Sequence, residues 1–366
     1  MRIAIDAMGS DNAPGVEIEG AVRASLESDM EVILVGDEAA LSEKLKAFPK
    51  HGSISIVHAS EVITMEDSPV LAVRKKKDSS LLVAMRLVKE GRADGIVSAG
   101  NTGAVMVAAR TVLGPIRGVA RSAICQTLPT LKGPVAILDL GANVDCTARH
   151  LCEFAEMGIA YSQYTLGVDN PRVGLLNIGE EDAKGTQVAK EVHRNLRAAP
   201  HVNFIGNVEP RAMYNGVADV VICDGFIGNL ILKTSEAVAG LMAQLMRQKF
   251  ESSSASKLGA VLARKALTEL KKIVDPNESP GAPLLGVNGT VIIIHGSSNS
   301  SGVAHAVLGA RVAIANRLNE HIAENIEELR AVERTVHEGS HPECAPPEEG
   351  AQEALHDRAE SGEGGE

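Results

Sequence analysis

The stretch DGIVSAGNTGAVM (residues 94–106) contains the pattern that decides the fold. Its short apolar run, GIV, stops at SAG, and an apolar pattern with helical spacing begins after NTG. A strand that passes directly into a helix is one half of a βαβ unit. The corner between them carries two glycines, an asparagine and a threonine, which is more than an ordinary turn requires.

Seven further β-branched runs alternate with helical patterns along the chain. Such alternation predicts an α/β fold with a mostly parallel sheet and helices on both faces. The runs are almost continuously apolar, as expected for strands that are covered on both sides. The predicted strands are residues 3–5, 32–35, 54–57, 96–97, 135–138, 173–176, 220–222 and 291–294.

Six of the predicted strands end in small polar corners. These corners are IDAMGSDNAPG (5–15), VSAGNTGA (97–104), LDLGANVD (138–145), LNIGEEDAKGT (176–186), CDGFIGN (223–229) and HGSSNSSG (295–302). In a parallel sheet they lie at the carboxyl edge, where open α/β folds bind ligands. Each corner also leads toward a helix N-terminus, which favours an anion. One such corner can be an ordinary helix cap, but six together indicate an anion-binding cleft.

Composition and missing motifs exclude several classes of protein. Aromatic residues make up 2% of the chain and there is no Trp, so a nucleic-acid partner that stacks bases on aromatic rings is not expected. The nucleotide motifs GxGxxG and GxxxxGK[ST] are absent, as are HExxH and the esterase pattern GxSxG. We therefore expect no metal and no cofactor.

The formal charge of −11 is unevenly distributed. Residues 337–366 hold nine acids and one arginine, so the rest of the chain is nearly balanced. We expect a folded domain over residues 1–335 and a disordered acidic tail over 336–366, which is rich in Glu, Gly and Pro. The five cysteines form no CxxC pair, and neither a signal peptide nor an 18-residue apolar run is present. These features predict a cytoplasmic protein.

Eight ordered motifs resemble those of the bacterial phosphate acyltransferases. The motifs are IAIDAMGSDNAP, MEDSPVLAVRKKKDSSL, GIVSAGNTGAVM, LDLGANVDC, LLNIGEEDAKGT, FIGNVEPR, VICDGFIGNLILK and GAPLLGVNGTVIIIHGSSN. The resemblance runs from Arg2 to Arg330. It implies an isocitrate/isopropylmalate-dehydrogenase-like fold, similar also to phosphotransacetylase. It also implies transfer of a long-chain fatty acyl group from acyl carrier protein to inorganic phosphate. This chain has Gly9-Ser10 where the family has Gly-Gly, so Ser10 is strained if that position requires positive φ.

The implied reaction needs a phosphate cradle, donors for an oxyanion, and an acid or cation near the departing thiolate. We expect Lys184, Asn229 and His295 to be catalytic. Lys184 would bind phosphate or stabilise developing charge, unless it is a surface lysine paired with Glu180 or Glu181. Asn229 would orient the carbonyl or the phosphate, or cap the following helix. His295 would hydrogen-bond phosphate or protonate the thiolate, or be satisfied by backbone.

Nine further residues are expected to bind phosphate or to shape the site. Asp6 would repel phosphate, so its expected role is to orient a neighbouring donor. Lys233 is placed one turn inside the helix that follows the CDGFIGN corner. The nine residues are Asn101, Thr102, Gly103, Ser297, Ser298, Lys233, Asp6, Asn12 and Asn143.

Two regions suggest macromolecular partners. The basic run Arg74, Lys75, Lys76 and Lys77 suits an acidic acyl carrier protein, although a solvated basic face is the alternative. Residues 235–274 carry two amphipathic stripes joined by the turn ESSSAS and predict a helical hairpin. The resemblance implies that this hairpin protrudes, packs in a homodimer and touches the membrane peripherally. The alternative for the hairpin is ordinary packing within one chain. The resemblance also implies a further partner, a downstream membrane glycerol-3-phosphate acyltransferase.

Two other functions remain open at this stage. A phosphotransacetylase-like enzyme would use coenzyme A thioesters with the same chemistry. A non-enzymatic scaffold for lipid synthesis would keep the fold without the reaction.

Overall fold

The computed structural model describes residues 1–338 of the 366-residue chain, with side chains to residue 331. Residues 1–330 form one compact unit, and the chain from Ala331 onward forms a second. The last helix continues to Glu338, and the rest of the predicted acidic tail lies outside the described residues.

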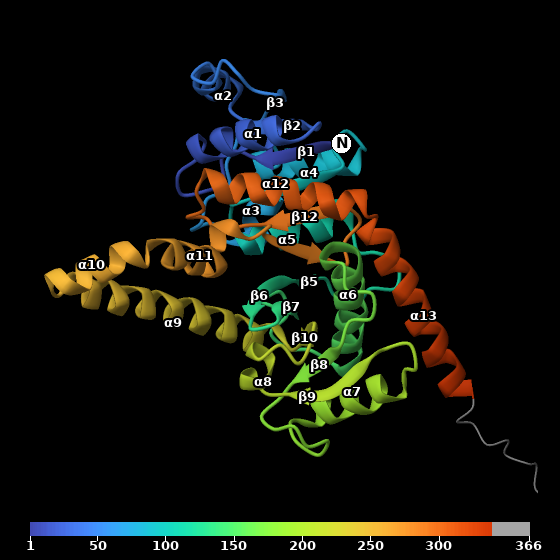
Figure 1. The fold of residues 1–366 in the computed structure, drawn as a ribbon. Helices are drawn as coiled ribbons and strands as arrows, with labels where there is room; N and C mark the ends of the chain where they lie inside the picture. Colours follow the sequence, from blue (N-terminus) through green and yellow to red (C-terminus); the bar gives the residue numbers. More distant parts are fainter. Residues whose placement is uncertain (339–366) are drawn as a thin grey trace, which may run out of the picture. The chain divides into compact units, whose positions relative to one another are not determined.

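Two sheets, rather than one, make up the first unit (Figure 1). The first has the order β3-β2-β1-β4-β12-β11-β5. Its strands are β1 (Arg2–Asp6), β2 (Glu31–Gly36), β3 (Ser53–His58), β4 (Gly95–Ser98), β5 (Ala123–Ile124), β11 (Ala282–Leu285) and β12 (Thr290–Ile293). All neighbouring pairs from β3 to β12 are parallel, whereas β11 is antiparallel to both β12 and β5.

The second sheet has the order β6-β7-β10-β8-β9. Its strands are β6 (Gln126–Thr130), β7 (Gly133–Leu138), β8 (Val173–Leu176), β9 (Phe204–Val208) and β10 (Val220–Ile222). Only the edge strand β6 is antiparallel to its neighbour. The prediction of an α/β fold with mostly parallel strands is therefore confirmed, and all eight predicted strands are present.

Helices connect most of the parallel strands (Figure 1). They are α1 (Gly15–Glu27), α2 (Glu38–Leu45), α3 (Pro69–Lys75), α4 (Ser80–Lys89), α5 (Thr102–Ala108), α6 (Ala148–Leu166), α7 (Gln187–Ala198), α8 (Pro210–Tyr214), α9 (Gly225–Glu251), α10 (Ser254–Leu262), α11 (Arg264–Val274), α12 (Ser300–Ala315) and α13 (Leu318–Glu338). Two short turns, η1 (Ala109–Leu113) and η2 (Pro276–Glu278), are π-helical and 3-10 helical.

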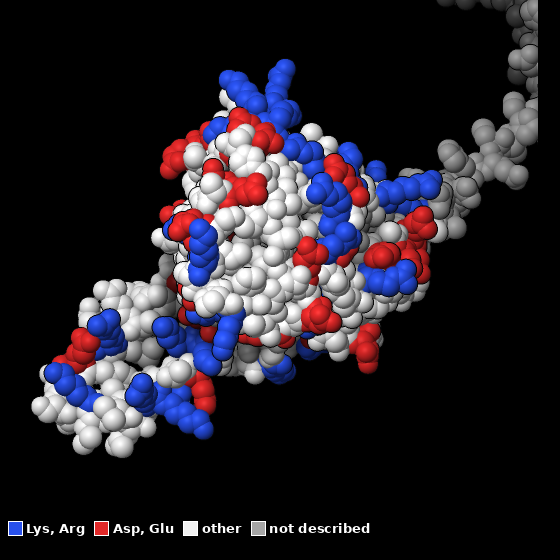
Figure 2. Space-filling view, turned by 90° about the horizontal axis from the view of Figure 1, so that it is seen from above, with Lys and Arg blue, Asp and Glu red and all other residues white. Residues whose placement is uncertain are grey.

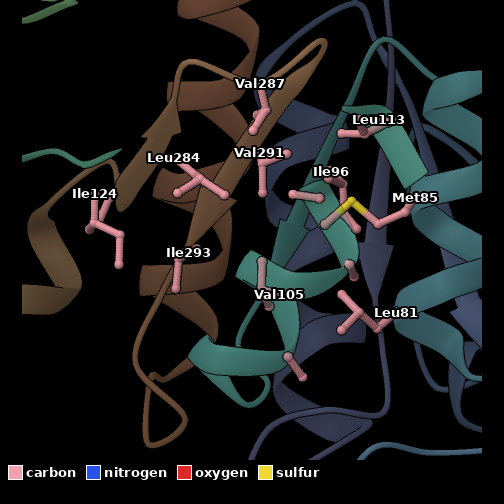
Figure 3. Close-up of a cluster of buried hydrophobic side chains, with 14 of the residues drawn as sticks. Leu81, Met85, Ile96, Val105, Leu113, Ile124, Leu284, Val287, Val291 and Ile293 are labelled. Carbon is pink, nitrogen blue, oxygen red and sulfur yellow. The ribbon is translucent and has the colours of Figure 1, made fainter. Parts of the chain in front are cut away.

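A continuous hydrophobic cluster joins the two sheets. It contains Ile96 and Val291 from the first sheet together with Ile137 and Val221 from the second. Figure 3 shows its centre, where Met85 of α4 points toward the side chains of β4 and β12. Because few aromatic residues are available, Ile, Val, Leu and Met fill this core, and the two sheets share one hydrophobic interior.

The predicted hairpin is built from α9, α10 and α11, which project beyond the sheets (Figure 1). Its second leg is divided at Ala263 into two helices, where a single helix was expected. Large apolar side chains on the hairpin are exposed; they are Val238, Leu241, Met242, Leu245, Leu258, Val261, Leu262, Leu270, Ile273 and Val274.

Candidate active site

The six polar corners fall into two groups of three, because the fold has two sheets. The first corner group consists of residues 5–15, 97–104 and 295–302, which follow the adjacent strands β1, β4 and β12. The second corner group consists of residues 138–145, 176–186 and 223–229, which follow the adjacent strands β7, β8 and β10. Each corner leads into a helix, as expected. The prediction of one shared sheet edge is therefore corrected, because the two groups lie at the edges of two different sheets.

Asp6 lies at the centre of the first corner group. Its buried carboxylate accepts hydrogen bonds from the hydroxyls of Ser80 (2.6 Å) and Ser98 (2.8 Å). Burial raises the pKa of Asp6, and the two serine hydroxyls partly oppose this effect. Ser98 Oγ in turn accepts the backbone N–H of Gly100 (3.1 Å). Asp6 thus orients serine hydroxyls and, through Ser98, the glycine corner of the opening stretch.

The NTG sequence of the opening stretch is explained by packing on two sides. Asn101 caps α5 by accepting the N–H of Ala104 (3.0 Å), and its amide donates to the carbonyls of Met65 and Asp67 (both 3.1 Å). A Cβ on Gly103 would lie 2.7 Å from a ring carbon of Pro69 at the start of α3. Both ends of the Asn101 side chain are therefore used to hold this corner against the preceding loop. In this structure Asn101 therefore has no free N–H group with which to make the expected direct contact with phosphate.

This packing predicts opposite effects of the same substitution at two helical glycines. Gly103→Ala is expected to lower the free energy of unfolding by about 1 kcal/mol, because overpacking costs more than the gain in helix propensity. Gly240→Ala, in the exposed part of α9 where a Cβ meets nothing, is expected to raise it by about 0.5–1 kcal/mol. Urea unfolding of both variants measures the difference. Equal effects at the two positions would contradict the packing account.

Ser10 shows no sign of the backbone strain that a lost glycine would cause. Within the described residues, Arg317 is the only residue other than glycine with positive φ. The Ser10 hydroxyl is buried beside the carboxyl of Glu17, in the first turn of α1, and partly opposes the effect of burial on it. Burial raises the pKa of Glu17 to about 7, and the charge of Asp6 contributes in the same direction.

His295 follows β12 and is exposed. Its Nδ1 accepts the backbone N–H of Ser297 (3.2 Å) and lies 2.7 Å from the Ser297 hydroxyl. Because Nδ1 needs its lone pair for that N–H, a neutral ring carries its proton on Nε2. His295 can therefore present an N–H donor to an oxygen or a sulfur atom. The backbone N–H and the hydroxyl of Ser297 both contact His295, whereas Ser298 is buried.

The second corner group is organised around Asp139, at the end of β7. Its carboxylate accepts backbone N–H groups from Ile124 (3.0 Å), Ala142 (3.1 Å) and Asn143 (2.6 Å). Burial raises the pKa of Asp139, and these hydrogen bonds oppose the rise. The side-chain amide of Asn143 donates to Asp139 (3.0 Å) and to the carbonyl of Ser122 (2.8 Å). Asn143 therefore shapes this corner, and both of its contacts are internal.

Lys184 is exposed in the corner after β8. Its backbone is fixed, because its N–H donates to Glu181 O (3.0 Å) and its carbonyl accepts from the Asn177 amide (3.2 Å). Within the described residues its ammonium forms no ion pair, so the alternative pairing with Glu180 or Glu181 is absent. A fixed backbone and an unpaired ammonium are what binding of an anion requires.

One expectation for α9 is corrected. Asp224, and not Asn229, caps this helix, by accepting the N–H of Ile227 (2.9 Å). Asn229 lies in the second turn of α9 and is exposed, about 3.7 Å from the position of a Cβ on Gly141. Lys233 lies a further turn along, and its ammonium pairs with Glu236 (2.9 Å). Asn229 is therefore available beside the 138–145 corner, whereas Lys233 already has an acidic partner.

The remaining predicted residues are divided between open and occupied positions. Asn12 and Thr102 are exposed in the first corner group. In the basic run, Arg74, Lys75 and Lys77 are exposed, and Lys77 donates to the carbonyl of Val73 (3.1 Å). Lys76 is half-buried and pairs with Asp67 (2.5 Å).

Two organising residues, Ser80 and Ser98, were not predicted from the sequence; both hold Asp6. Asp139, which accepts three backbone N–H groups, and Asp224, which caps α9, have the hydrogen-bonding and helix-capping roles that an acid directly after an apolar run predicts. No local pattern brings Ser80 to Asp6, since 74 positions separate them.

Three further observations concern ligands and membranes. Among the described residues, no group of three or more His, Cys, Asp and Glu side chains is arranged to hold a metal ion. No described helix has both the length and the apolar composition needed to cross a bilayer. A surface hollow of about 420 Å³ lies beside the amino ends of β4 and β12, lined by residues that include Asp94, Thr290 and Arg317. It contains none of the predicted site residues.

Two solved structures with a similar fold are a phosphotransacetylase and a phosphotransacylase. The enzyme from Streptococcus pyogenes superimposes with a TM-score of 0.59 at 17% identity, covering 89% of this chain and 94% of that one. A branched-chain phosphotransacylase from Enterococcus faecalis gives 0.55 at 15% identity, covering 86% and 99%. The chain therefore has a phosphotransacetylase-like fold.

Sequence comparison identifies the family within this fold. Residues 1–321 match the family model described as "Fatty acid synthesis protein". A relative from Desulfitobacterium hafniense, named phosphate acyltransferase, is 46% identical over 334 residues, which cover 91% of this chain and all of the relative. Another of that name, from Moorella thermoacetica, is 49% identical over 307 residues, covering 84% and 90%. The chain belongs to this phosphate acyltransferase family.

Proposed function

We propose that this protein transfers a long-chain fatty acyl group from acyl carrier protein to inorganic phosphate, giving an acyl phosphate for phospholipid synthesis. The observation that carries the proposal is the match to phosphate acyltransferases over nearly the whole folded unit. The polar corners at the carboxyl ends of parallel strands support it, because this is where such folds bind anions.

The proposed chemistry needs no nucleophilic side chain. A phosphate oxygen forms a bond to the thioester carbonyl carbon, and the C–S bond then breaks with its electron pair leaving on sulfur. Lys184 would offset the negative charge that develops on phosphate or on the carbonyl oxygen. His295, with its proton on Nε2, would donate to phosphate or to the departing thiolate. Asn229 would orient the carbonyl from the second turn of α9.

The exposed cations and apolar side chains of the protein support a proposal for its partners and location. Arg74 and Lys75 would face the acidic carrier protein and hasten its association. The hairpin carries exposed apolar side chains together with exposed Lys and Arg, and Figure 2 shows such cations, with a few acids, on the protruding part of the surface. We infer a cytoplasmic homodimer whose hairpin binds anionic membranes peripherally, close to a membrane acyltransferase that uses the product. Sedimentation of the protein, alone and with phosphatidylglycerol vesicles, tests the dimer and the membrane binding.

A direct assay separates the proposed reaction from its alternatives. Purified protein is mixed with long-chain acyl carrier protein and phosphate, and hydroxylamine traps acyl phosphate as the hydroxamate. The expected result is phosphate-dependent hydroxamate from the carrier-protein donor. Product only from acyl-coenzyme A would indicate a phosphotransacetylase-like enzyme, which the fold also permits. A folded protein that gives no product from either donor would favour a scaffold.

A further inference from the structure

The corner that carries Lys184 contains three acids, yet one of them is held on a neighbouring helix. Asp182 lies two positions from Lys184. Its carboxylate lies at ion-pair distance from His193 Nε2 (3.1 Å) and from an Arg197 nitrogen (3.9 Å), while Nε2 has no partner of hydrogen-bond geometry within the described residues. Both partners belong to α7. Asp182 is 73% exposed and His193 only 8%, so the pair joins a surface acid to a group anchored in the interior.

The position of the His193 ring is fixed by packing. It packs edge-on against Phe204 of β9, with ring centroids 5.2 Å apart. The guanidinium of Arg197 lies over the same ring, 5.5 Å from its centroid. α7 and β9 therefore fix the position at which Asp182 is held.

The rest of the corner is fastened independently of Asp182. The amide of Asn207 donates to Glu181 O (2.8 Å), and the amide of Asn177 donates to Lys184 O (3.2 Å). The backbone on both sides of Asp182 is thus fixed by other contacts, and the Asp182–His193 pair is not needed to hold it. What the pair determines is where the Asp182 carboxylate points.

We propose that His193 is a positioning residue that holds the Asp182 carboxylate on α7 and so leaves the Lys184 ammonium free for an anionic substrate. The inference rests on the proposed function, since it assumes that Lys184 meets phosphate. A carboxylate released near Lys184 would pair with it and repel phosphate, and each effect weakens anion binding. The geometry points to the phosphate KM as the quantity affected, because Lys184 itself stays in place.

The test is a set of variants assayed for the phosphate KM and kcat by hydroxylamine trapping. His193→Leu, which cannot hold the acid, is expected to raise the phosphate KM about three- to tenfold, with kcat changed by less than about twofold. His193→Gln keeps a polar group but cannot carry a positive charge, so it is expected to restore only part of the affinity. Asp182→Asn breaks the pair without releasing a charge, so its phosphate KM is expected to stay within about twofold of the wild-type value.

The double variant His193→Leu/Asp182→Asn distinguishes positioning from general support of the fold. Positioning predicts that its phosphate KM returns toward the wild-type value, because no carboxylate is left to compete. Glu180→Gln, at an exposed acid of the same corner, serves as the control, and thermal unfolding verifies that each variant is folded. A double variant as impaired as His193→Leu would overturn the proposal.

Lys184→Met separates this inference from the proposed function. If Lys184→Met raises the phosphate KM but His193→Leu does not, only the role of His193 is wrong. If Lys184→Met leaves both kinetic constants unchanged, then Lys184 is outside the site, and the roles proposed for Lys184 and His193 both fail while the acyl transfer itself stands.

Discussion

Lys184→Met is expected to lower kcat/KM for acyl phosphate formation by about 100-fold, in the range found when one stabilising group is removed from developing negative charge. The reason is geometric. The ammonium is exposed without an acidic partner, and the backbone on either side of it is fixed by hydrogen bonds to Glu181 and Asn177. Its removal should therefore subtract a charge from the site without disturbing the corner.

Lys190→Met provides the matched control for this prediction. Lys190 lies in the first turn of α7, six positions along the chain, and carries the same charge on an element outside the predicted site. Its replacement should change kcat/KM by less than about twofold, because surface charges are worth little when screened. If the two variants lose activity equally, a general effect of positive charge explains the result, and Lys184 has no special role.

Much of the fold was predictable because buried parallel strands leave a strong signal. Every predicted strand is a β-branched run that the structure buries, except the half-buried edge strand β3, and each polar corner leads into a helix. Strands β5, β6, β9 and β11 were missed. β5 has two residues, while β6 and β11 contain proline and β9 contains glycine at positive φ, so none gives a continuous apolar run. The division into two sheets depends on pairing between distant strands, which no local pattern encodes.

The candidate site was predictable as a set of corners but not as a set of contacts. Glycine and polar residues after a strand predict the start of a helix near a ligand. This pattern selected Lys184, Asn229 and His295, and all three side chains are exposed in the structure. Tertiary contacts decide which of the predicted side chains already have hydrogen-bond partners within the protein. Asn101 is used by residues 64–67 and Asn143 by Ser122, and both partners come from other parts of the fold.

Glu17 is an ionisable group that no sequence pattern indicated. It is only 1% exposed, in the first turn of α1, and neither of its oxygens has a partner of normal hydrogen-bond geometry within the described residues. Asp6 is the charged group nearby that raises its pKa, and the first turn of α12, which packs on α1, contains no titratable side chain. Burial raises the pKa of Glu17 to about 7, because the Ser10 hydroxyl opposes this effect only in part.

Glu17→Gln is therefore expected to stabilise the protein at pH 8 but not at pH 4.5. Below pH 4.5 the carboxyl is neutral in both folded and unfolded chains, so it makes no difference to stability. Between pH 4.5 and about 7 the unfolded chain ionises while the folded chain keeps the proton, and wild-type stability falls as pH rises. Above pH 7 the full cost is present, about 3 kcal/mol on this shift, and glutamine avoids it.

Urea unfolding of the wild type and Glu17→Gln across pH 5 to 8 measures the growing difference. Glu19→Gln, two positions along α1 in a half-exposed pair with Arg23, should shift stability by less than about 0.5 kcal/mol at every pH. A constant difference between wild type and Glu17→Gln would show that Glu17 does not titrate in this range. A pH-dependent one would mean that the chain retains a costly carboxyl beside Asp6. Strongly perturbed acids gather at functional sites, so this result would support the first corner group as part of the active site on physical grounds, without reference to relatives.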